Sequence, residues 1–197
     1  MLDVICSSDM LQGSLTYFTS DRFGKQNSAL ALNRGWTQVP TGIYFNTPEF
    51  TFSVWVYPQQ IGSWSRVIDF GNGAQSDNIF LSLSNGNYLL PIFQIWSKPA
   101  LIFSEQSSQN LTLNSWQFIA VTFNVTIARI YLNGTLTAEL KQYYTLPTLN
   151  RTNCFIGKSN WNDGFSSSYL DDLRFYSKSF TQTELIQLMN QNSTSNK

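Results

Sequence analysis

Three segments in the last third of this chain decide its fold. Residues 153–161 read Asn-Cys-Phe-Ile-Gly-Lys-Ser-Asn-Trp, residues 169–176 read Tyr-Leu-Asp-Asp-Leu-Arg-Phe-Tyr, and residues 180–185 read Phe-Thr-Gln-Thr-Glu-Leu. Their order predicts a strand, a loop with an aromatic tip, a closing strand and one short helix. The stretch therefore indicates an all-β domain and contains no catalytic motif that we identify.

Apolar and polar residues alternate with a period of two along much of the remaining chain. In residues 50–57, Phe50, Phe52, Val54 and Val56 share one face, as in a strand with one buried face. Similar or shorter patterns predict strands at 29–32, 37–39, 66–70, 79–83, 93–96, 101–103, 115–123, 128–132 and 135–140. Short strands separated by Gly, Asn, Ser and Pro predict an antiparallel sandwich.

Signals for turns and helix ends complete this organisation. The dipeptide Asn133-Gly134 predicts a tight hairpin turn. Residues 181–190 are the helical candidate, and Thr181 with Glu184 three residues later predicts a capping box at its start. We expect a single domain over residues 1–190 and a polar tail or linker over 191–197.

The composition excludes several classes of partner. Charged residues make up 12% of the 197 residues and the formal net charge is zero, whereas nucleic acids and anionic membranes attract basic surfaces. No apolar run approaches the roughly 20 residues that a spanning helix needs, and no signal peptide follows Met1. Abundant Ser, Thr, Asn and Gln suit an extracellular or cell-surface setting, so we expect a domain from a larger multidomain chain.

Glycosylation and a disulfide bond both depend on that setting. Asn-x-Ser/Thr sequons begin at Asn110, Asn124, Asn133, Asn150 and Asn192, and they accept glycans only in a secretory pathway. Chance matches in an Asn- and Thr-rich chain are the alternative. Cys6 and Cys154 allow one disulfide bond or two free thiols.

The ordered set of segments resembles the laminin-G-like domain of the concanavalin A-like lectin/glucanase superfamily. The resemblance covers about residues 10 to 188 and is carried by residues 28–33, 50–58, 66–73, 77–78, 114–122, 130–134, 155–157 and 170–176. It implies a jelly-roll sandwich of two antiparallel sheets and a role in extracellular recognition or adhesion, often through glycans and sometimes with calcium. The family's usual first aromatic strand is missing after Met1, so we expect a truncated chain or another segment over that edge.

The sequence argues against catalysis. It contains no His, the commonest acid/base residue, and two Cys without His do not make a usual zinc site. The glucanases of the superfamily carry Glu-x-Asp-x-Glu on one strand, whereas the four Glu here are widely separated. A glycan-processing enzyme of unfamiliar geometry would have to use Asp69, Asp77 or Asp163.

Two loops are the candidate ligand-binding sites. Residues 71–78 offer Asn72, Asp77 and Asn78, and residues 158–164 offer Asn160, Trp161, Asn162 and Asp163. An exposed Trp161 would stack on the C–H face of a pyranose while neighbouring amides bind its hydroxyls. The alternatives are turn-forming loops that need no ligand and a Trp161 that folds back onto the sandwich as a lid.

Acidic residues around the closing strand are the candidate metal site. The apolar positions slip by one across Asp171-Asp172, which predicts a β-bulge there. With Asp21, these carboxylates would offer calcium the oxygen ligands that it prefers. Alternatively an Asp–Arg pair with Arg174 pins the closing strand, and Asp21-Arg22 tethers the N-terminal segment by a salt bridge.

The most economical interpretation is a non-catalytic extracellular module whose partner is a glycan or a glycosylated protein, with calcium as a candidate cofactor. A structural or protein-binding domain without a sugar site is the alternative.

Overall fold

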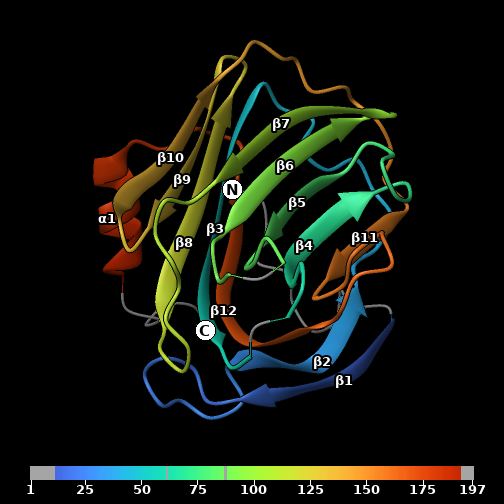
Figure 1. Ribbon diagram of the computed structural model, residues 1–197. Helices are drawn as coiled ribbons and strands as arrows, with labels where there is room; N and C mark the ends of the chain where they lie inside the picture. Colours follow the sequence, from blue (N-terminus) through green and yellow to red (C-terminus); the bar gives the residue numbers. More distant parts are fainter. Residues whose placement is uncertain (1–11, 61, 87, 192–197) are drawn as a thin grey trace.

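A computed structural model describes residues 12–60, 62–86 and 88–191. Within these ranges the chain forms twelve strands and one helix (Figure 1). The strands are β1 (Gln12–Thr19), β2 (Ala29–Gln38), β3 (Glu49–Pro58), β4 (Arg66–Gly71), β5 (Ile79–Ser82), β6 (Ile92–Ser97), β7 (Ala100–Gln106), β8 (Gln117–Asn124), β9 (Ile127–Leu132), β10 (Thr135–Lys141), β11 (Asn153–Ile156) and β12 (Ser166–Tyr176), followed by the helix α1 (Gln182–Met189). The all-β prediction with one short C-terminal helix is confirmed.

The strands form one continuous antiparallel path that curls around the core. Its order is β10-β9-β8-β3-β12-β2-β11-β4-β5-β6-β7, and β1 pairs with β2. Its two halves face each other across the core, since the rings of Phe50 and Phe93 are 6.3 Å apart and those of Phe103 and Phe123 are 5.4 Å apart. Its two ends approach each other, because the backbone N–H of Ser108, just after β7, donates to the carbonyl of Thr137 in β10 at 3.0 Å. Figure 1 shows β6 and β7 in front of β3 and β12.

The core follows from the alternation of apolar residues in the strands. Val54 and Val56 of β3 are fully buried, and burial of such a side chain stabilises the fold by about 1.5–3 kcal/mol. On the outer face of the sheet, α1 covers a second apolar cluster through Leu185 and Leu188. Its start has the predicted capping box of Thr181 and Glu184.

Most predicted strands are confirmed, with two informative differences. The separate candidates at 29–32 and 37–39 belong to one strand, β2, because the backbone continues through a bulge between them. Strand β1 was not predicted, and it pairs along β2. The hairpin turn is confirmed by positive φ angles at Asn133 and Gly134.

The remaining sequence predictions fall partly outside the described residues. Cys6 and residues 192–197 of the predicted tail (191–197) lie outside them. The two predicted alternatives for Cys6 and Cys154, one disulfide bond or two free thiols, are therefore untested. Cys154 itself is buried, and this burial raises the pKa of its thiol to about 12. The described part of the chain has no helix that is long and apolar enough to span a membrane.

Candidate functional site

The two predicted ligand loops meet at the buried carboxylate of Asp69 on β4. Asn160 donates to it from its backbone N–H and its side-chain amide, each at 2.9 Å, and Asn78 donates from its side-chain amide at 2.9 Å. Burial raises the pKa of Asp69, although the charge of Arg66 and the amide donors oppose that shift. The side-chain amides of Asn78 and Asn160 are therefore engaged inside the protein.

Asp163, a third predicted ligand residue, forms an ion pair with the same buried arginine. Arg66 Nη2 lies 3.1 Å from Asp163 Oδ2, and Arg66 Nε lies 3.4 Å from Asp69 Oδ2. The guanidinium is only 2% exposed and lies 3.9 Å from the ring centroid of Phe80. Burial lowers the pKa of Arg66, while Asp69 and Asp163 raise it.

Trp161 folds back over the outer face of β5 and β6. Its half-buried ring lies 5.7 Å from the ring of Phe80 and 5.7 Å from that of Trp96. Its backbone N–H donates to Ser159 Oγ at 3.0 Å. Of the two predicted arrangements of Trp161, the structure shows the lid, whereas its neighbour Asn162 is exposed.

The last two predicted residues fasten loops together. Asn72 accepts from the backbone N–H of Thr152 at 2.9 Å and donates to the carbonyl of Asn150 at 3.1 Å. Asp77 accepts from the backbone N–H of Lys98 at 3.3 Å. Ligand binding by the two loops stays a prediction, because most of their polar groups already have partners in the protein.

The predicted bulge at Asp171-Asp172 is present and its carboxylates face arginines. The register shifts between Asp171 and Arg174, and Asp172 has φ 48°. Arg22 pairs with both Asp171 and Asp172, and Arg174 Nη2 lies 2.8 Å from Asp172 Oδ1. Burial raises the pKa of Asp171, against the effect of the Arg22 charge.

Other groups already contact the carboxylates that the sequence predicted to bind calcium, and calcium binding stays a prediction. Asp21 Oδ1 accepts the backbone N–H groups of Phe23 and Lys25 at 2.9 Å, and, besides burial, the charge of Asp21 helps to raise the pKa of Asp171. The guanidinium of Arg22 already supplies the positive charge between the carboxylates of Asp171 and Asp172. Across the described ranges, no group of three or more His, Cys, Asp or Glu side chains is arranged to hold a metal ion.

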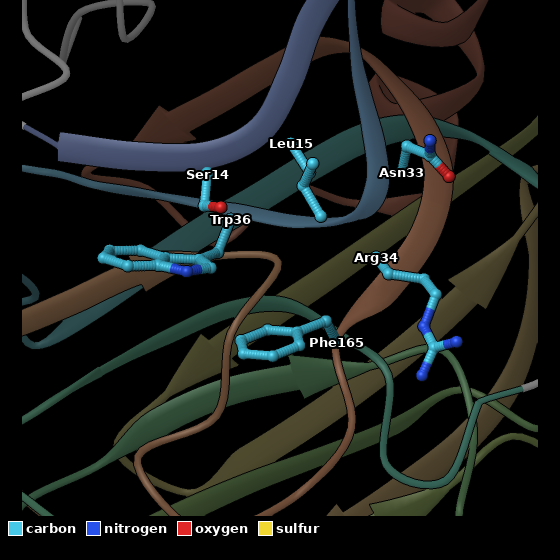
Figure 2. Close-up of a pocket in the computed structure, with 6 residues that line it drawn as sticks. All are labelled: Ser14, Leu15, Asn33, Arg34, Trp36 and Phe165. Atoms are coloured by element: carbon cyan, nitrogen blue, oxygen red, sulfur yellow. The ribbon is translucent and has the colours of Figure 1, made fainter.

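A surface pocket of about 420 Å³ opens at the bulge that joins β1, β2 and the start of β12. It is lined by Ser14, Leu15, Asn33, Arg34, Trp36 and Phe165. Figure 2 shows the rings of Trp36 and Phe165 on one side and the side chain of Arg34 on the other, with Leu15 above them. Three segments that are far apart in the sequence thus build one site.

Both β1 and β2 depart from regular strand geometry where they form the backbone of this pocket. Between the pairs Ser14–Trp36 and Thr16–Leu32 the register shifts, and Leu15 and Arg34 both have φ 54°. Such bulges redirect side chains out of the regular alternation. Gly35 makes the close approach possible, because a Cβ there would clash with the carbonyl oxygens of Ser14 and Leu15.

One wall of the pocket is apolar and open to solvent. Leu15 is 64% exposed and Phe165 is 42% exposed. Trp36 is half-buried and fixed from behind, since its ring meets Phe155 edge-on at 5.6 Å and Lys158 Nζ lies 4.2 Å from its centroid. Apolar side chains at this degree of exposure, gathered in a concavity, are typical of interaction sites.

Two polar side chains of the pocket have no partner within residues 12–60, 62–86 and 88–191. Asn33 and Arg34 are exposed, and neither side chain forms a hydrogen bond or an ion pair with the described part of the chain. The sequence predictions missed Ser14, Leu15, Asn33, Arg34 and Phe165 as site residues and left Trp36 unassigned. A signal was present: Asn33-Arg34-Gly35 interrupts an alternating strand immediately before a Trp.

Comparison with protein families gives one match. The model of the concanavalin A-like lectin/glucanases superfamily matches residues 33–186. A search of curated protein sequences finds no significant match.

Solved structures with the same fold include carbohydrate-related and toxin domains. Domain 4 of AbnA, an extracellular arabinanase of Geobacillus stearothermophilus solved with arabinotriose, is 19% identical over 89% of this chain and 87% of its own, with a TM-score of 0.66. The binding domain of botulinum neurotoxin serotype D/C is 16% identical, with a TM-score of 0.66 over 90% of this chain. A chain of botulinum neurotoxin type C, whose cell entry depends upon interaction with two ganglioside molecules, is 15% identical, with a TM-score of 0.61 over 91% of this chain. This chain spans 46% of each of the two neurotoxin chains.

Proposed function

Because the chain belongs to the concanavalin A-like lectin/glucanases superfamily, we propose that it is a non-catalytic carbohydrate-binding module. The proposed site is the pocket of Trp36 and Phe165. The observation that carries this choice is the combination of an exposed apolar wall with the side chains of Asn33 and Arg34, which have no partner among the described residues. A pyranose offers the matching chemistry, an apolar C–H face rimmed by hydroxyl groups.

The two predicted ligand loops differ from the pocket, because their carboxylates already have partners in the protein, and this difference supports placing the site in the pocket. The carboxylates of Asp69 and Asp163 are occupied by Arg66 and by amide and hydroxyl donors. A sugar hydroxyl would have to break those bonds before it could bind, and a buried polar group left unpaired costs about 1–3 kcal/mol. In the pocket a hydroxyl group would displace only solvent.

The same network argues against catalysis. The chain has no His, and two of the three candidate catalytic carboxylates, Asp69 and Asp163, pair with Arg66. The third, Asp77, accepts a backbone hydrogen bond at the start of β5. A general acid and base must both reach the substrate, and these groups face protein donors instead.

The wider assignments rest on the family and its neighbours. We interpret the curled sheet as the two-sheet jelly roll, and we assign an extracellular role with a glycan or glycoprotein partner. Domain 4 of AbnA comes from an extracellular enzyme, and the ganglioside dependence of botulinum neurotoxin type C is a second case of a glycan ligand. Calcium at Asp21, Asp171 and Asp172 stays a prediction, because the ion would have to displace Arg22.

A glycan array tests the function, run once with calcium and once with chelator. We expect binding in both arms, reduced at least tenfold in Phe165→Ala with little change in melting temperature, because this pocket side chain is largely open to solvent. Trp161→Ala is the comparison variant, since it removes the ring from the second predicted site. Loss of binding in Trp161→Ala alone would place the site on the outer face of β5 and β6. Absence of wild-type binding to every glycan on the array would refute the proposal.

A protein partner is the second candidate function. Tyr17 and Phe18 of β1 and Phe23 of the turn that follows are 51%, 46% and 53% exposed. Open aromatic side chains of this kind are the residues that protein interfaces bury. The structural alternative would be favoured by two results together: no binding on the glycan array, and burial of these residues by a neighbouring domain that carries no glycan.

A further inference from the structure

We propose that the pocket selects acidic sugars, with Arg34 binding a carboxylate or sulfate group while the sugar ring lies on Trp36 and Phe165. This inference rests on the proposed carbohydrate-binding function and specifies its ligand class. None of the six residues that line the pocket is acidic, so an anion would meet no like charge there.

Arg34 differs from every other arginine of the chain. The other five have partners: Arg22, Arg66, Arg129 and Arg174 form ion pairs with carboxylates, and Arg151 donates to the backbone carbonyls of Tyr44 and Asp77. Arg34 alone makes no such contact with the described residues. Among the described residues its guanidinium is thus the arginine donor without a partner, and it lies at the mouth of an aromatic pocket. It is permanently charged, and its planar fork matches a carboxylate or sulfate.

The backbone sets the direction in which this side chain leaves β2. Arg34 has φ 54° within the bulge, and its neighbours Trp36 and Gly35 pair with β1 and β12. A bulge redirects a side chain out of the regular alternation of a strand, and the exposed Arg34 side chain lines the pocket.

A second cation strengthens the positive field beside the pocket. Lys158 Nζ lies 4.2 Å from the ring centroid of Trp36 and 4.5 Å from that of Phe155. It forms no ion pair with the described part of the chain. We infer that Lys158 contributes attraction over a distance, while Arg34 makes the direct contact.

The test compares matched ligands by isothermal titration calorimetry. The probes are an oligogalacturonate, the same oligosaccharide with its carboxyl groups reduced to alcohols, and a sulfated oligosaccharide of equal length. We expect the acidic sugars to bind at least tenfold more tightly than the reduced one, since a hydrogen bond to a charged group contributes about 1.5–3 kcal/mol. The preference for carboxylate or sulfate will tell which of the two anions the pocket takes.

Arginine variants decide which residue is responsible. Arg34→Gln should lower the affinity for the acidic sugar to that for the reduced sugar, and Lys158→Gln should weaken it by a smaller factor that vanishes at high salt. Arg129→Gln is the matched control, because it removes the same charge from the β9–β10 surface and should leave binding unchanged.

The outcomes separate the two proposals. Equal binding of the acidic and reduced sugars, with no effect of Arg34→Gln, would overturn the acidic specificity and leave the carbohydrate-binding function standing. Absence of binding to any sugar would overturn both.

Discussion

Asn160 donates two hydrogen bonds of 2.9 Å to the carboxylate of Asp69, one from its backbone N–H and one from its side-chain amide. This double contact ties the loop that carries Trp161 to the middle of β4. The same loop begins beside Lys158 and ends at Phe165, which lines the pocket. The buried carboxylate therefore supports the pocket from a distance, without contact with a ligand there.

Asp69→Asn should strongly destabilise the protein. The substituted amide would direct N–H groups at the amides of Asn78 and Asn160 and would leave the buried Arg66 without one of its two carboxylates. Breaking a buried ion pair by removal of one partner costs about 3–5 kcal/mol, and urea unfolding would measure it. Glu139→Gln, in an exposed pair with Arg129, should cost less than about 1 kcal/mol; equal effects of both variants would contradict this role of Asp69.

Gly35→Ala should disturb the docking of β1 on β2 and with it the pocket. The added methyl group would overlap two backbone carbonyl oxygens, which cannot move as a side-chain end would, and overpacking of this kind costs typically 1–3 kcal/mol. We expect a lower melting temperature and weaker glycan binding. Gly164→Ala is the control, because the nearest atom to its Cβ would be the Ser63 carbonyl oxygen at 3.7 Å. A Gly35→Ala variant with unchanged stability and binding would show that β1 has room to shift.

Arg22→Ala should convert a calcium-independent protein into a calcium-responsive one. Wild-type protein should melt at the same temperature in calcium and in chelator, because Arg22 neutralises Asp171 and Asp172. The variant leaves these two carboxylates with Arg174 alone, so its melting temperature should fall and partly recover in calcium. Differential scanning calorimetry measures both effects. A fall in the wild-type melting temperature on chelation would instead favour the calcium site predicted from the sequence.

The start of α1 should give a pH-dependent contribution to stability. Lys178 and then the backbone and hydroxyl groups of Thr181 lower the pKa of Glu184 from 4.5 to about 2. Because the folded-state pKa is depressed, ionised Glu184 contributes stability above pH 4.5 and loses that contribution as the pH falls toward 2. The difference in melting temperature between wild type and Glu184→Gln should shrink over this interval. A difference that stays constant down to pH 2 would exclude the ion pair and cap as its source.

The sequence predicted β3 because its apolar residues alternate, although polar residues between them are buried as well. Val54 and Val56 show this pattern, and both are fully buried. The bulge at Asp171-Asp172 was also predictable, because the parity of apolar residues slips there. Strand β1 was missed because Gln12–Thr19 places large residues at Leu15, Tyr17 and Phe18 without regular alternation, and all three side chains are exposed.

The candidate site was harder to predict than the fold. The residue types at 158–164 suggested ligand binding, but long-range partners decide which polar groups are free. Asn160 and Asp163 could be seen as engaged only once Asp69 and Arg66 were placed next to them. Conversely, the importance of Arg34 depends on the absence of a partner among the described residues, and no local pattern reports such an absence.

The pocket joins Leu15 and Arg34, near the start of the chain, to Phe165, which most of the polypeptide separates from them. During synthesis, a growing chain would display the Arg34 bulge long before the segment that carries Phe165 leaves the ribosome. Sugar binding would therefore be acquired late, after β12 has paired with β2. A ligand that binds only the finished pocket would then hold these early and late segments together. It would raise the free energy of unfolding by RT ln(1 + [L]/Kd).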